Sequence, residues 1–342
     1  MSKSYYIIPI FVPQEGCPHN CVFCNQDRIT GVKDDFTAQT VRETIHSYLE
    51  TIKNKEATIE VSFFGGTFTG IREEKQKAFL EVAKEFKEKK LIDKIRLSTR
   101  PDYISDYILT YLTEYKVDII ELGVQSLDDE VLKKSGRGHS VSDVRKASKL
   151  IKKYGFILGH QIMPGLPGDT FEKDIKTTEM SLEMKPDICR IYPSLVIKDT
   201  PMERMYMNKD YVPYSLEEAV KISKIMYHMY ITNEVNVIRI GLQPTETINE
   251  GADIVAGPFH PSFRELVEGS LLVDRILEAM QNEKSAVIQI NPRDLSKLYA
   301  NKKIYFNKLK ESGKTVSVKQ NEELNRGCIK LSLKEKFLDI TY

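Results

Sequence analysis

The stretch that decides the fold of this chain is Cys17-Pro18-His19-Asn20-Cys21-Val22-Phe23-Cys24, which follows an apolar, strand-like run over residues 5–11. Its three cysteines have the spacing C-x3-C-x2-C. Three thiolates can hold three irons of a [4Fe–4S] cluster, since such clusters are normally held by cysteine. The other cysteines, Cys189 and Cys328, are distant in sequence. The fourth iron would therefore be open to a further ligand, as is usual in a catalytic metal site.

A structural zinc site is the alternative for the same segment. The three cysteines and His19 supply the ligand set of a Cys3His zinc knuckle, a common kind of site. Because His19 lies between Cys17 and Cys21, it would need a cramped turn to share their metal, so the spacing favours the iron–sulfur cluster. A zinc-stabilised module that binds nucleic acid or protein is the non-enzymatic hypothesis.

Length and composition indicate a folded globular protein. The 342 residues can bury one large core or two modest ones, and 41% of them are apolar. The net charge of +1 argues against a broad electrostatic footprint for nucleic acid and leaves room only for a local basic patch. No apolar run is long enough to span a bilayer, and we expect no signal peptide. We therefore expect a cytoplasmic protein whose cysteines bind metal rather than form disulfides.

The first two-thirds of the chain alternates short β-branched runs with longer amphipathic stretches, a pattern typical of βα units and a parallel sheet. The predicted strands are 5–11, 58–64, 94–98, 119–124, 156–163, 188–192 and 235–240. The predicted helices are 38–53, 73–90, 106–115, 141–154, 171–184 and 216–233. The expected fold is α/β, a partial (β/α)6-type TIM barrel with its active site at the C-terminal ends of the strands.

The rhythm changes at about Gly251. Residues 262–282 predict a helix, 285–290 a strand, and 314–342 short antiparallel strands with turns at 325–327 and 333–336. We therefore divide the chain into a barrel over 1–250 and a small C-terminal α+β cap over 251–342. The cap is expected to lie over the open side of the barrel and to contribute to the substrate site.

The cysteine motif, with the aromatic Phe23 before its last cysteine, resembles that of the radical S-adenosylmethionine (SAM) superfamily. The resemblance implies that Cys17, Cys21 and Cys24 hold a [4Fe–4S] cluster and that SAM binds its open iron. It also implies that the reduced cluster cleaves SAM to a 5′-deoxyadenosyl radical, which takes a hydrogen atom from the substrate. The implied partner is an electron donor such as flavodoxin or ferredoxin.

Near the ends of the second, third and fifth strands, some residues resemble SAM-binding motifs of this superfamily. Others are explained by an ordinary turn, a local salt bridge or core packing. Residues 65–67, Gly-Gly-Thr, resemble the glycine-rich motif that holds the amino group of SAM; alone, they would be an ordinary βα turn. Ser98 stands where relatives often carry a SAM-binding glutamate, which puts that contact in doubt. Arg100 and Asp102 could form a local salt bridge, and a lone histidine such as His160 is more often a core residue.

Later strand ends carry further matches to the superfamily. Gln125 and Arg137 correspond to a pair that contacts the carboxylate and ribose of SAM, since a guanidinium fork suits a carboxylate. Gln161 resembles a ribose-contacting position and Met163 a position that packs on adenine, while Tyr192 could line the cavity. The SAM-binding residues implied by the resemblance are Phe23, Gly65, Gly66, Thr67, Ser98, Gln125, Arg137, Gln161, Met163 and Tyr192.

Six phrases keep the order they have in the radical SAM domain of the Elongator catalytic subunit, and the resemblance covers residues 5–240. That enzyme has a basic N-terminal extension for tRNA and a C-terminal acetyltransferase domain. We expect neither here, so a tRNA substrate and acetyl-CoA chemistry are not implied. The phrases are Gly-Gly-Thr-Phe at 65–68, Thr-Arg-Pro-Asp-Tyr at 99–103, Gly-Val-Gln-Ser at 123–126, Arg-Gly-His at 137–139, Met-Pro-Gly-Leu-Pro at 163–167 and Tyr-Pro-Ser-Leu-Val-Ile at 192–197.

The substrate site is predicted beyond the last strand of the barrel. Arg239, the rigid loop that contains His260 and Phe263, and the following Glu265 could stack on and contact a planar ring. Packing between barrel and cap explains the same loop equally well.

The whole chain is similar to the queuine lyases of clostridia. That similarity implies hydrogen abstraction from the cyclopentenediol of free queuine and cleavage of its C–N bond. The product is 7-aminomethyl-7-deazaguanine, for queuosine salvage. A carboxylate is expected to pair with the N–H edge of the deazaguanine, and the sequence does not say which one.

A stand-alone enzyme that modifies the wobble uridine of tRNA is the alternative function. It would need a basic face, for which the lysine-rich segments 85–94 and 302–319 are the candidates. Such lysines usually lie on solvated helix faces.

Overall fold

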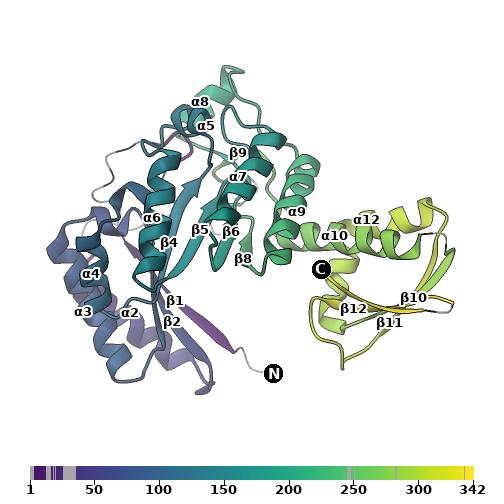
Figure 1. Ribbon diagram of the computed structural model, residues 1–342, viewed down its shortest axis with the longest axis horizontal. Helices are drawn as coiled ribbons and strands as arrows, with labels where there is room; N and C mark the ends of the chain where they lie inside the picture. Colours follow the sequence, from purple (N-terminus) through teal and green to yellow (C-terminus); the bar gives the residue numbers. More distant parts are fainter. Residues whose placement is uncertain are drawn as a thin grey trace.

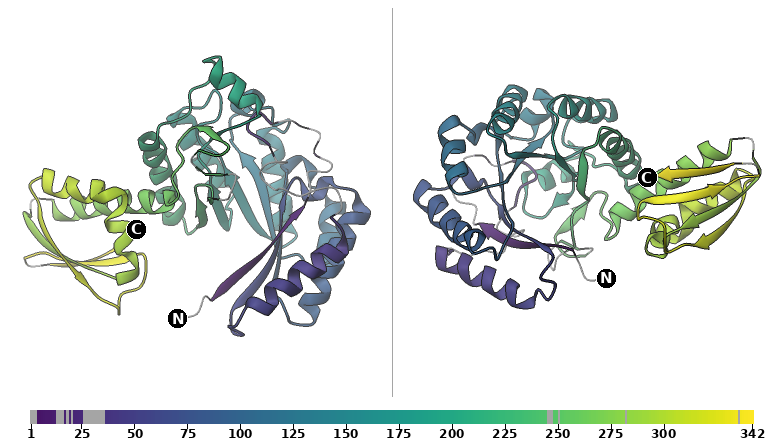
Figure 2. Two further views of the ribbon diagram at one scale, coloured as in Figure 1. Left: turned by 180° about the vertical axis from the view of Figure 1, so that it is seen from behind. Right: turned by 60° about the horizontal axis from the view of Figure 1, so that its bottom comes forward.

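The computed structural model describes residues 4–12, 17, 19, 21–25, 36–244, 248–249, 251–281, 283–334 and 336–342. Seven parallel strands form one curled sheet in the order β1-β2-β3-β4-β5-β6-β8, with helices covering its outer face (Figures 1 and 2). This is the predicted partial barrel, with six βα units and a closing strand. The strands are β1 (Tyr5–Val12), β2 (Thr58–Gly65), β3 (Lys94–Thr99), β4 (Ile119–Gln125), β5 (Ile157–Ile162), β6 (Ile188–Ile191) and β8 (Asn236–Ile240).

Polar residues just before the outer helices fix where several of them begin. Thr37, Ser140 and Ser215 each form a capping box, in which the side chains of the cap residue and of the third helical residue satisfy each other's backbone N–H groups. The predicted helices are confirmed to within about one turn at each end. They are α2 (Ala38–Thr51), α3 (Glu73–Glu88), α4 (Asp106–Glu114), α6 (Val141–Lys153), α7 (Phe171–Glu183) and α9 (Leu216–Thr232).

Short elements that the sequence did not predict lie among the loops after the strands. They are the 3-10 turns η1 (Phe68–Gly70) and η2 (Pro101–Tyr103), the helices α5 (Asp129–Lys134) and α8 (Pro201–Met207), and the two-stranded sheet of β7 (Val196–Ile197) and β9 (Ile254–Ala256). Since β9 pairs with β7, residues just beyond the predicted boundary at 250 are joined to the barrel. The division of the chain at that residue stays a prediction.

The main core lies between the sheet and its outer helices. Alternate strand residues such as Ile8, Val61, Ile95 and Leu158 are fully buried there. Because side chains alternate across a strand, the residues between them face the inner, concave side of the sheet. That inner side is polar: a hydrogen-bonded network of charged side chains crosses it.

The C-terminal residues form an α+β unit beside α9, joined to the barrel by α10 (Phe263–Met280). Its strand order is β11-β10-β12-β13, and Figure 1 shows helices on one face of this sheet only. Its remaining elements are β10 (Ser285–Ile290), η3 (Pro292–Asp294), α11 (Leu295–Leu298), α12 (Ala300–Glu311), β11 (Thr315–Gln320), β12 (Cys328–Ser332) and β13 (Phe337–Thr341).

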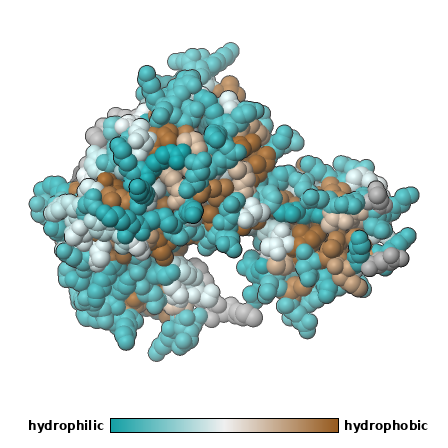
Figure 3. All heavy atoms as spheres, viewed as in Figure 1, coloured by the Kyte–Doolittle hydropathy of each residue, from teal (hydrophilic) through white to brown (hydrophobic). Residues whose placement is uncertain are grey.

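One expectation for the C-terminal strands was wrong. β12 and β13 are antiparallel as predicted, but β11 pairs in parallel with β10, because the chain crosses over through α11 and α12 between them. The face in Figure 3 is largely hydrophilic, with apolar side chains showing on the barrel and on the C-terminal unit. In the described part of the chain, no helix has the length and apolar character needed to cross a membrane.

Candidate active site

The cysteine segment is held against the carboxyl ends of the strands. The backbone N–H of Val22 donates to the carbonyl of Ser135 at 3.0 Å, and its carbonyl accepts from the N–H of Met202 at 2.8 Å. The side chains of Val22 and Phe23 pack on an apolar cluster with Leu166. The segment therefore lies between the end of α5 and the start of α8, above the strand ends, where the barrel pattern places the active site.

The three thiols differ in exposure. Cys21 is buried, whereas Cys17 and Cys24 are partly exposed. Within the described residues, no three Cys, His, Asp or Glu side chains lie close enough together to hold a metal ion. The His19 ring lies against Gly138, with its Nε2 4.0 Å from an oxygen of Asp102, so the proposed fourth zinc ligand faces a carboxylate.

Two buried arginines surround the cysteine segment with positive charge. Arg137 Nη1 donates to Cys21 Sγ at 3.3 Å, and its Nη2 donates to the carbonyl of Gly123 at 2.6 Å. Arg100 forms the predicted salt bridge with Asp102, at 2.9 Å. Burial alone would lower the pKa of Arg100, but Asp102 and the nearby Cys21 and Cys17 raise it above the ordinary value. Two guanidinium groups therefore lie beside the cysteine segment.

The end of β4 forms a polar cradle beside these arginines. Gln125 has a φ of 66°, rare for a residue with a side chain, and sits at an irregularity in the β4–β5 register. An added methyl group on Gly123 would lie 3.1 Å from both Arg137 Nη2 and Gln125 Nε2, so the three residues adjoin. Three buried polar atoms here have no hydrogen-bond partner among the described residues: Gln125 Oε1, Arg137 Nε and Arg100 Nη1. Since buried polar groups are normally paired, these atoms point to a ligand that both donates and accepts.

The glycine-rich turn after β2 lies beside the end of β1. Gly65 has a φ of 111°, and a Cβ there would overlap the carbonyl oxygen of Val12, so only glycine fits. Gly66 is half-buried and Thr67 is buried at the start of η1. The turn therefore lies next to the point from which β1 leads into the cysteine segment.

The other predicted SAM-binding residues fall into two groups. Met163 packs on the apolar cluster of Phe23, and its N–H donates to the carbonyl of Gln125 at 2.8 Å, so it belongs with the cysteine segment. Gln161, Ser98 and Tyr192 instead belong to the inner face of the sheet. Gln161 Nε2 donates to Glu121 Oε2 at 2.8 Å and reaches Ser98 Oγ at 3.4 Å. Their assignment to SAM stays a prediction.

Charged residues of the inner face were missed at the sequence level. Glu121 accepts from Arg96, from Arg190 and from Gln161. Although burial alone would raise the pKa of Glu121, the guanidinium groups of Arg190 and Arg96 hold it below the ordinary value. One signal could have found these residues: single charges stand inside otherwise apolar strands, and period-2 alternation points them away from the helices.

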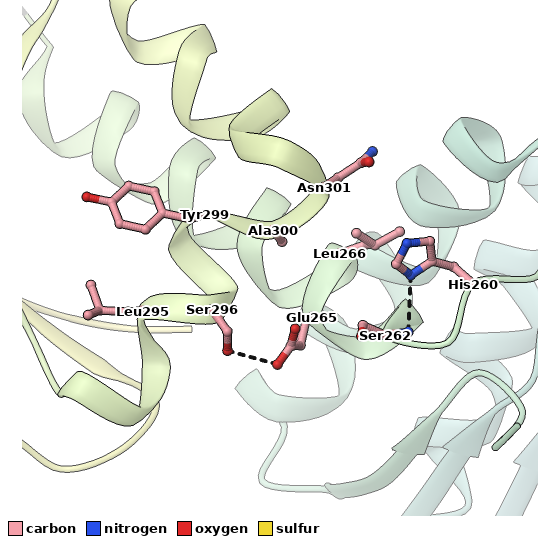
Figure 4. A pocket seen from close by; sticks show the side chains of 9 residues that line it. All are labelled: His260, Ser262, Glu265, Leu266, Leu295, Ser296, Tyr299, Ala300 and Asn301. Carbon is pink, nitrogen blue, oxygen red and sulfur yellow. Dashed lines mark hydrogen bonds between the residues drawn. The ribbon is translucent and has the colours of Figure 1, made fainter.

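The predicted substrate residues lie away from the cysteine segment. Arg239 is in register with Arg190 on the neighbouring strand, so it shares the inner face, and its Nη2 donates to Gln243 Oε1 at 2.7 Å. Phe263 is 3% exposed and belongs to the core, as the packing alternative expects. His260 and Glu265 line a cavity of about 380 Å³ between the start of α10 and residues 295–301 (Figure 4). There, the N–H of Ser262 donates to His260, and Ser296 donates to Glu265 at 2.8 Å.

Comparison with known proteins identifies the family. A family model described as the radical SAM superfamily matches residues 11–180, and a model of the radical SAM C-terminal domain matches residues 186–272. An uncharacterised protein of Methanocaldococcus jannaschii is 34% identical over 221 residues, which cover 61% of this chain and 67% of that protein. The chain belongs to the radical SAM superfamily.

Two further relatives of this radical SAM protein carry informative names. The tRNA uridine(34) acetyltransferase of Methanocaldococcus infernus is 29% identical over 255 residues, 63% of this chain and 48% of the relative. The chain thus spans about half the length of that curated relative. The solved structure of archaeal Elp3 from the same organism, with an N-terminal deletion, matches with a TM-score of 0.62 and 25% identity, covering 82% of this chain and 64% of that one.

Radical SAM enzymes use a [4Fe–4S] cluster and SAM, and these are the cofactors of this enzyme. The donor set fits them. Cysteine thiols are the usual ligands of such a cluster, Arg137 and Arg100 lie beside Cys21, and the unpartnered atoms of Gln125, Arg137 and Arg100 suit the charged ends of SAM. The residues that would hold the cluster are Cys17, Cys21 and Cys24.

Proposed function

We propose that this radical SAM enzyme acts on tRNA and modifies the wobble uridine. The observation that carries the proposal is the similarity to tRNA uridine(34) acetyltransferases from two Methanocaldococcus species. The proposal concerns the radical step alone and leaves the acetyl transfer in those relatives' names aside. Once bound and reduced, the cluster supplies one-electron cleavage of SAM to a 5′-deoxyadenosyl radical. The protein positions the substrate and keeps water out.

The charge distribution along the chain supports a nucleic-acid partner. Residues 284–342 hold 13 lysines and arginines against 6 acidic residues, a net charge of +7, whereas the whole chain carries only +1. A cationic unit joined to an anionic barrel is the electrostatic footprint expected of a protein that holds RNA at one end. The balanced total conceals this asymmetry.

One face of the C-terminal sheet suits RNA. The helices pack on the other face, so this face is uncovered (Figure 1). The register sets Lys319, Gln289, Lys330 and Asp339 side by side across the four strands, so the row holds two lysines and one carboxylate. Phe337 is 70% exposed, with the ammonium of Lys330 5.7 Å from its ring centroid. Lysines neutralise phosphates, and an exposed ring stacks on an unpaired base.

A coupled turnover assay tests the proposal. Anaerobically reconstituted protein is incubated with dithionite, SAM and transcribed tRNA, and 5′-deoxyadenosine and digested nucleosides are measured by mass spectrometry. We expect deoxyadenosine to rise with tRNA. The Cys24→Ala variant should produce none. Deoxyadenosine that does not respond to tRNA, in protein shown to carry its cluster, would contradict the tRNA proposal.

A second candidate is the cleavage of free queuine, favoured by the charge of the barrel. Residues 1–283 carry 37 basic and 43 acidic residues, a net charge of −6, which suits a small substrate with a protonated amine better than a polyanion at the catalytic end. In this C–N lyase reaction the radical would take a hydrogen from the cyclopentenediol, and 7-aminomethyl-7-deazaguanine would be released. The same assay with queuine in place of tRNA decides between the two, because only the lyase yields that base.

A further inference from the structure

A band of charged side chains crosses the inner face of the barrel below the cysteine segment. Glu60, Arg96, Glu121 and Arg190, on β2, β3, β4 and β6, are all buried. Arg96 Nη2 donates to Glu60 at 2.8 Å and Arg190 Nε donates to Glu121 at 2.9 Å, while Arg96 also donates to Glu121. The two carboxylates and two guanidinium groups of this band balance, and Arg239, in register with Arg190 on β8, adds a positive charge to the same face.

Two nitrogens in this band, Arg96 Nε and Arg190 Nη2, make no hydrogen bond among the described residues, but Arg96 Nε still lies 2.7 Å from a carboxylate oxygen of Glu60. Arg190 is 8% exposed; its Nε binds Glu121 and its Nη1 reaches the Tyr192 hydroxyl at 3.2 Å. Its Nη2 is buried without a hydrogen-bond partner among the described residues. A buried, unsatisfied guanidinium N–H is costly, so it points to an acceptor supplied by a ligand.

An acceptor lies beside that donor. Gln161 and Arg190 are in register on the neighbouring strands β5 and β6. Gln161 Nε2 donates to Glu121, whose carboxylate can only accept, and this fixes the orientation of the Gln161 amide. The amide oxygen of Gln161 therefore faces away from the Glu121 carboxylate. Both oxygens of Glu121 are engaged by Arg96, Arg190 and Gln161, so Glu121 positions these groups rather than binding a ligand itself.

Aromatic rings stand next to the donor and the acceptor. The Arg190 guanidinium carbon is 5.4 Å from the ring centroid of Phe64 on β2, four strands away, so the two side chains meet across the curled sheet. Phe11, in register with Phe64, has its ring centroid 6.2 Å away and is 43% exposed. These two rings, tilted by 39° to each other, offer apolar surface beside a hydrogen-bonding pair.

We propose that Phe64, Gln161 and Arg190 form a subsite for a neutral heterocyclic base with a lactam edge, an N–H next to a C=O. Arg190 Nη2 donates to the carbonyl, Gln161 Oε1 accepts from the ring N–H, and Phe64 packs on the ring face. This assigns Gln161 to the substrate instead of the SAM ribose. The inference rests on the proposed function in that the substrate carries a base. Uracil within tRNA and free 7-deazaguanine share the lactam edge.

Base binding to the full-length reconstituted protein tests the subsite without turnover. Titration calorimetry is performed with uridine, 3-methyluridine, 7-aminomethyl-7-deazaguanine and an anticodon stem-loop RNA. Uridine should bind at least about tenfold more tightly than 3-methyluridine, whose methyl group removes the N–H donor. Tighter binding of the stem-loop than of both small ligands assigns the base to tRNA, and the reverse order assigns it to a free base. Equal binding of uridine and 3-methyluridine, together with no binding of the deazaguanine, overturns the subsite.

Variants locate the binding within the barrel. Phe64→Leu and Gln161→Leu should each weaken base binding about tenfold and leave SAM affinity unchanged. Phe36→Leu is the matched control, since Phe36 packs edge-on against Phe79 in the core and should not affect base binding. Phe64 and Gln161 are partly exposed, so their variants should fold, whereas a substitution of Arg190 would break its buried ion pair with Glu121. Unchanged base affinity in both variants, or a parallel loss of SAM affinity, overturns the assignment. Neither result depends on which substrate turns over.

Discussion

At the scale of single residues, Arg137 connects two parts of the cofactor site. Its guanidinium group donates to Cys21 Sγ on one side and to the carbonyl of Gly123 on the other. The guanidinium carbon of Arg137 lies 6.0 Å from the centroid of the Phe23 ring. One buried side chain thus ties the cysteine segment to the end of β4, where the unpartnered Gln125 oxygen lies.

Arg137→Lys should weaken cluster binding. Lysine has a single ammonium group and cannot replace a planar fork that donates in two directions. Loss of a group that orients a metal ligand typically costs about 10- to 100-fold in metal affinity. Iron and sulfide per chain after limited reconstitution measure this. Arg145→Lys is the control. Arg145 lies on α6 and forms an exposed ion pair with Glu183 of α7, so this variant should reconstitute like the wild type. Full cluster content in Arg137→Lys would show that the contact with Cys21 has no such role.

His160 should make the protein less stable in acid. Its ring is buried between the hydroxyls of Ser148 and Ser181, and desolvation lowers its pKa to about 3. The unfolded chain, with a histidine pKa near 6.5, binds the proton first, so stability is present above 6.5 and falls as the pH drops toward 3. At pH 5 the loss is about 2 kcal/mol. Urea unfolding of wild type and His160→Gln between pH 7 and 5 measures it. An equal pH slope in both proteins would exclude His160 as the cause.

Cysteines, glycines and the Gln125–Arg137 pair could be predicted from the sequence because they stand in short motifs after strands. The structure brings Gly65, Gln125 and Arg137 to one end of the barrel. Glu121 and Arg190 could not be assigned in this way. Their roles depend on which strands become neighbours in a curled sheet, and a hydrogen bond across 69 residues has no local signature.

At the scale of elements, the turn after β2 depends on a glycine. Gly65→Ala should destabilise the protein by roughly 1–3 kcal/mol more than Gly155→Ala, and it should weaken SAM binding. Both glycines have positive φ, but an added methyl group at Gly65 overlaps the carbonyl of Val12, whereas nothing lies within 4 Å of one at Gly155. Denaturant unfolding and SAM titration of the two variants measure the difference. Equal stabilities would show that β1 moves freely enough to absorb the overlap.

Hydrophobic periodicity sufficed for most elements and failed where pairing is non-local. All seven barrel strands were predicted, since each has an apolar side that packs on a helix. The parallel pairing of β11 with β10 was not predicted. Residues 314–342 by themselves show turn signals, but they do not show that the chain crosses over through α12. Nor does periodicity predict Asn301, Lys302 and Lys303, which take left-handed φ values of 49° to 68° inside α12.

At the scale of the whole molecule, charge is separated along the chain. Residues 284–342 carry a net charge of +7 and residues 1–283 a net charge of −6, so the first set attracts a polyanion and the second repels it. The lysines of the C-terminal sheet would attract RNA phosphates at a distance from the cysteine segment. In the proposed arrangement, the anionic barrel would disfavour bulk RNA, and a single base would reach its inner face. Binding and chemistry would thus be assigned to different parts of one chain.

The salt dependence of tRNA binding tests this division. We expect affinity to fall steeply with salt, and the Lys319→Ala/Lys330→Ala double variant to have a log–log slope smaller by about 2, one for each lost phosphate contact. Lys146→Ala/Lys149→Ala, exposed on α6 of the anionic barrel, is the control and should keep the wild-type slope. Fluorescence anisotropy with labelled tRNA between 50 and 200 mM salt measures it. Loss of slope in both double variants would place tRNA on the barrel. Absence of tRNA binding in the wild type, with queuine turned over, would assign the positive charge of the C-terminal unit to another partner and the catalytic site to a free base.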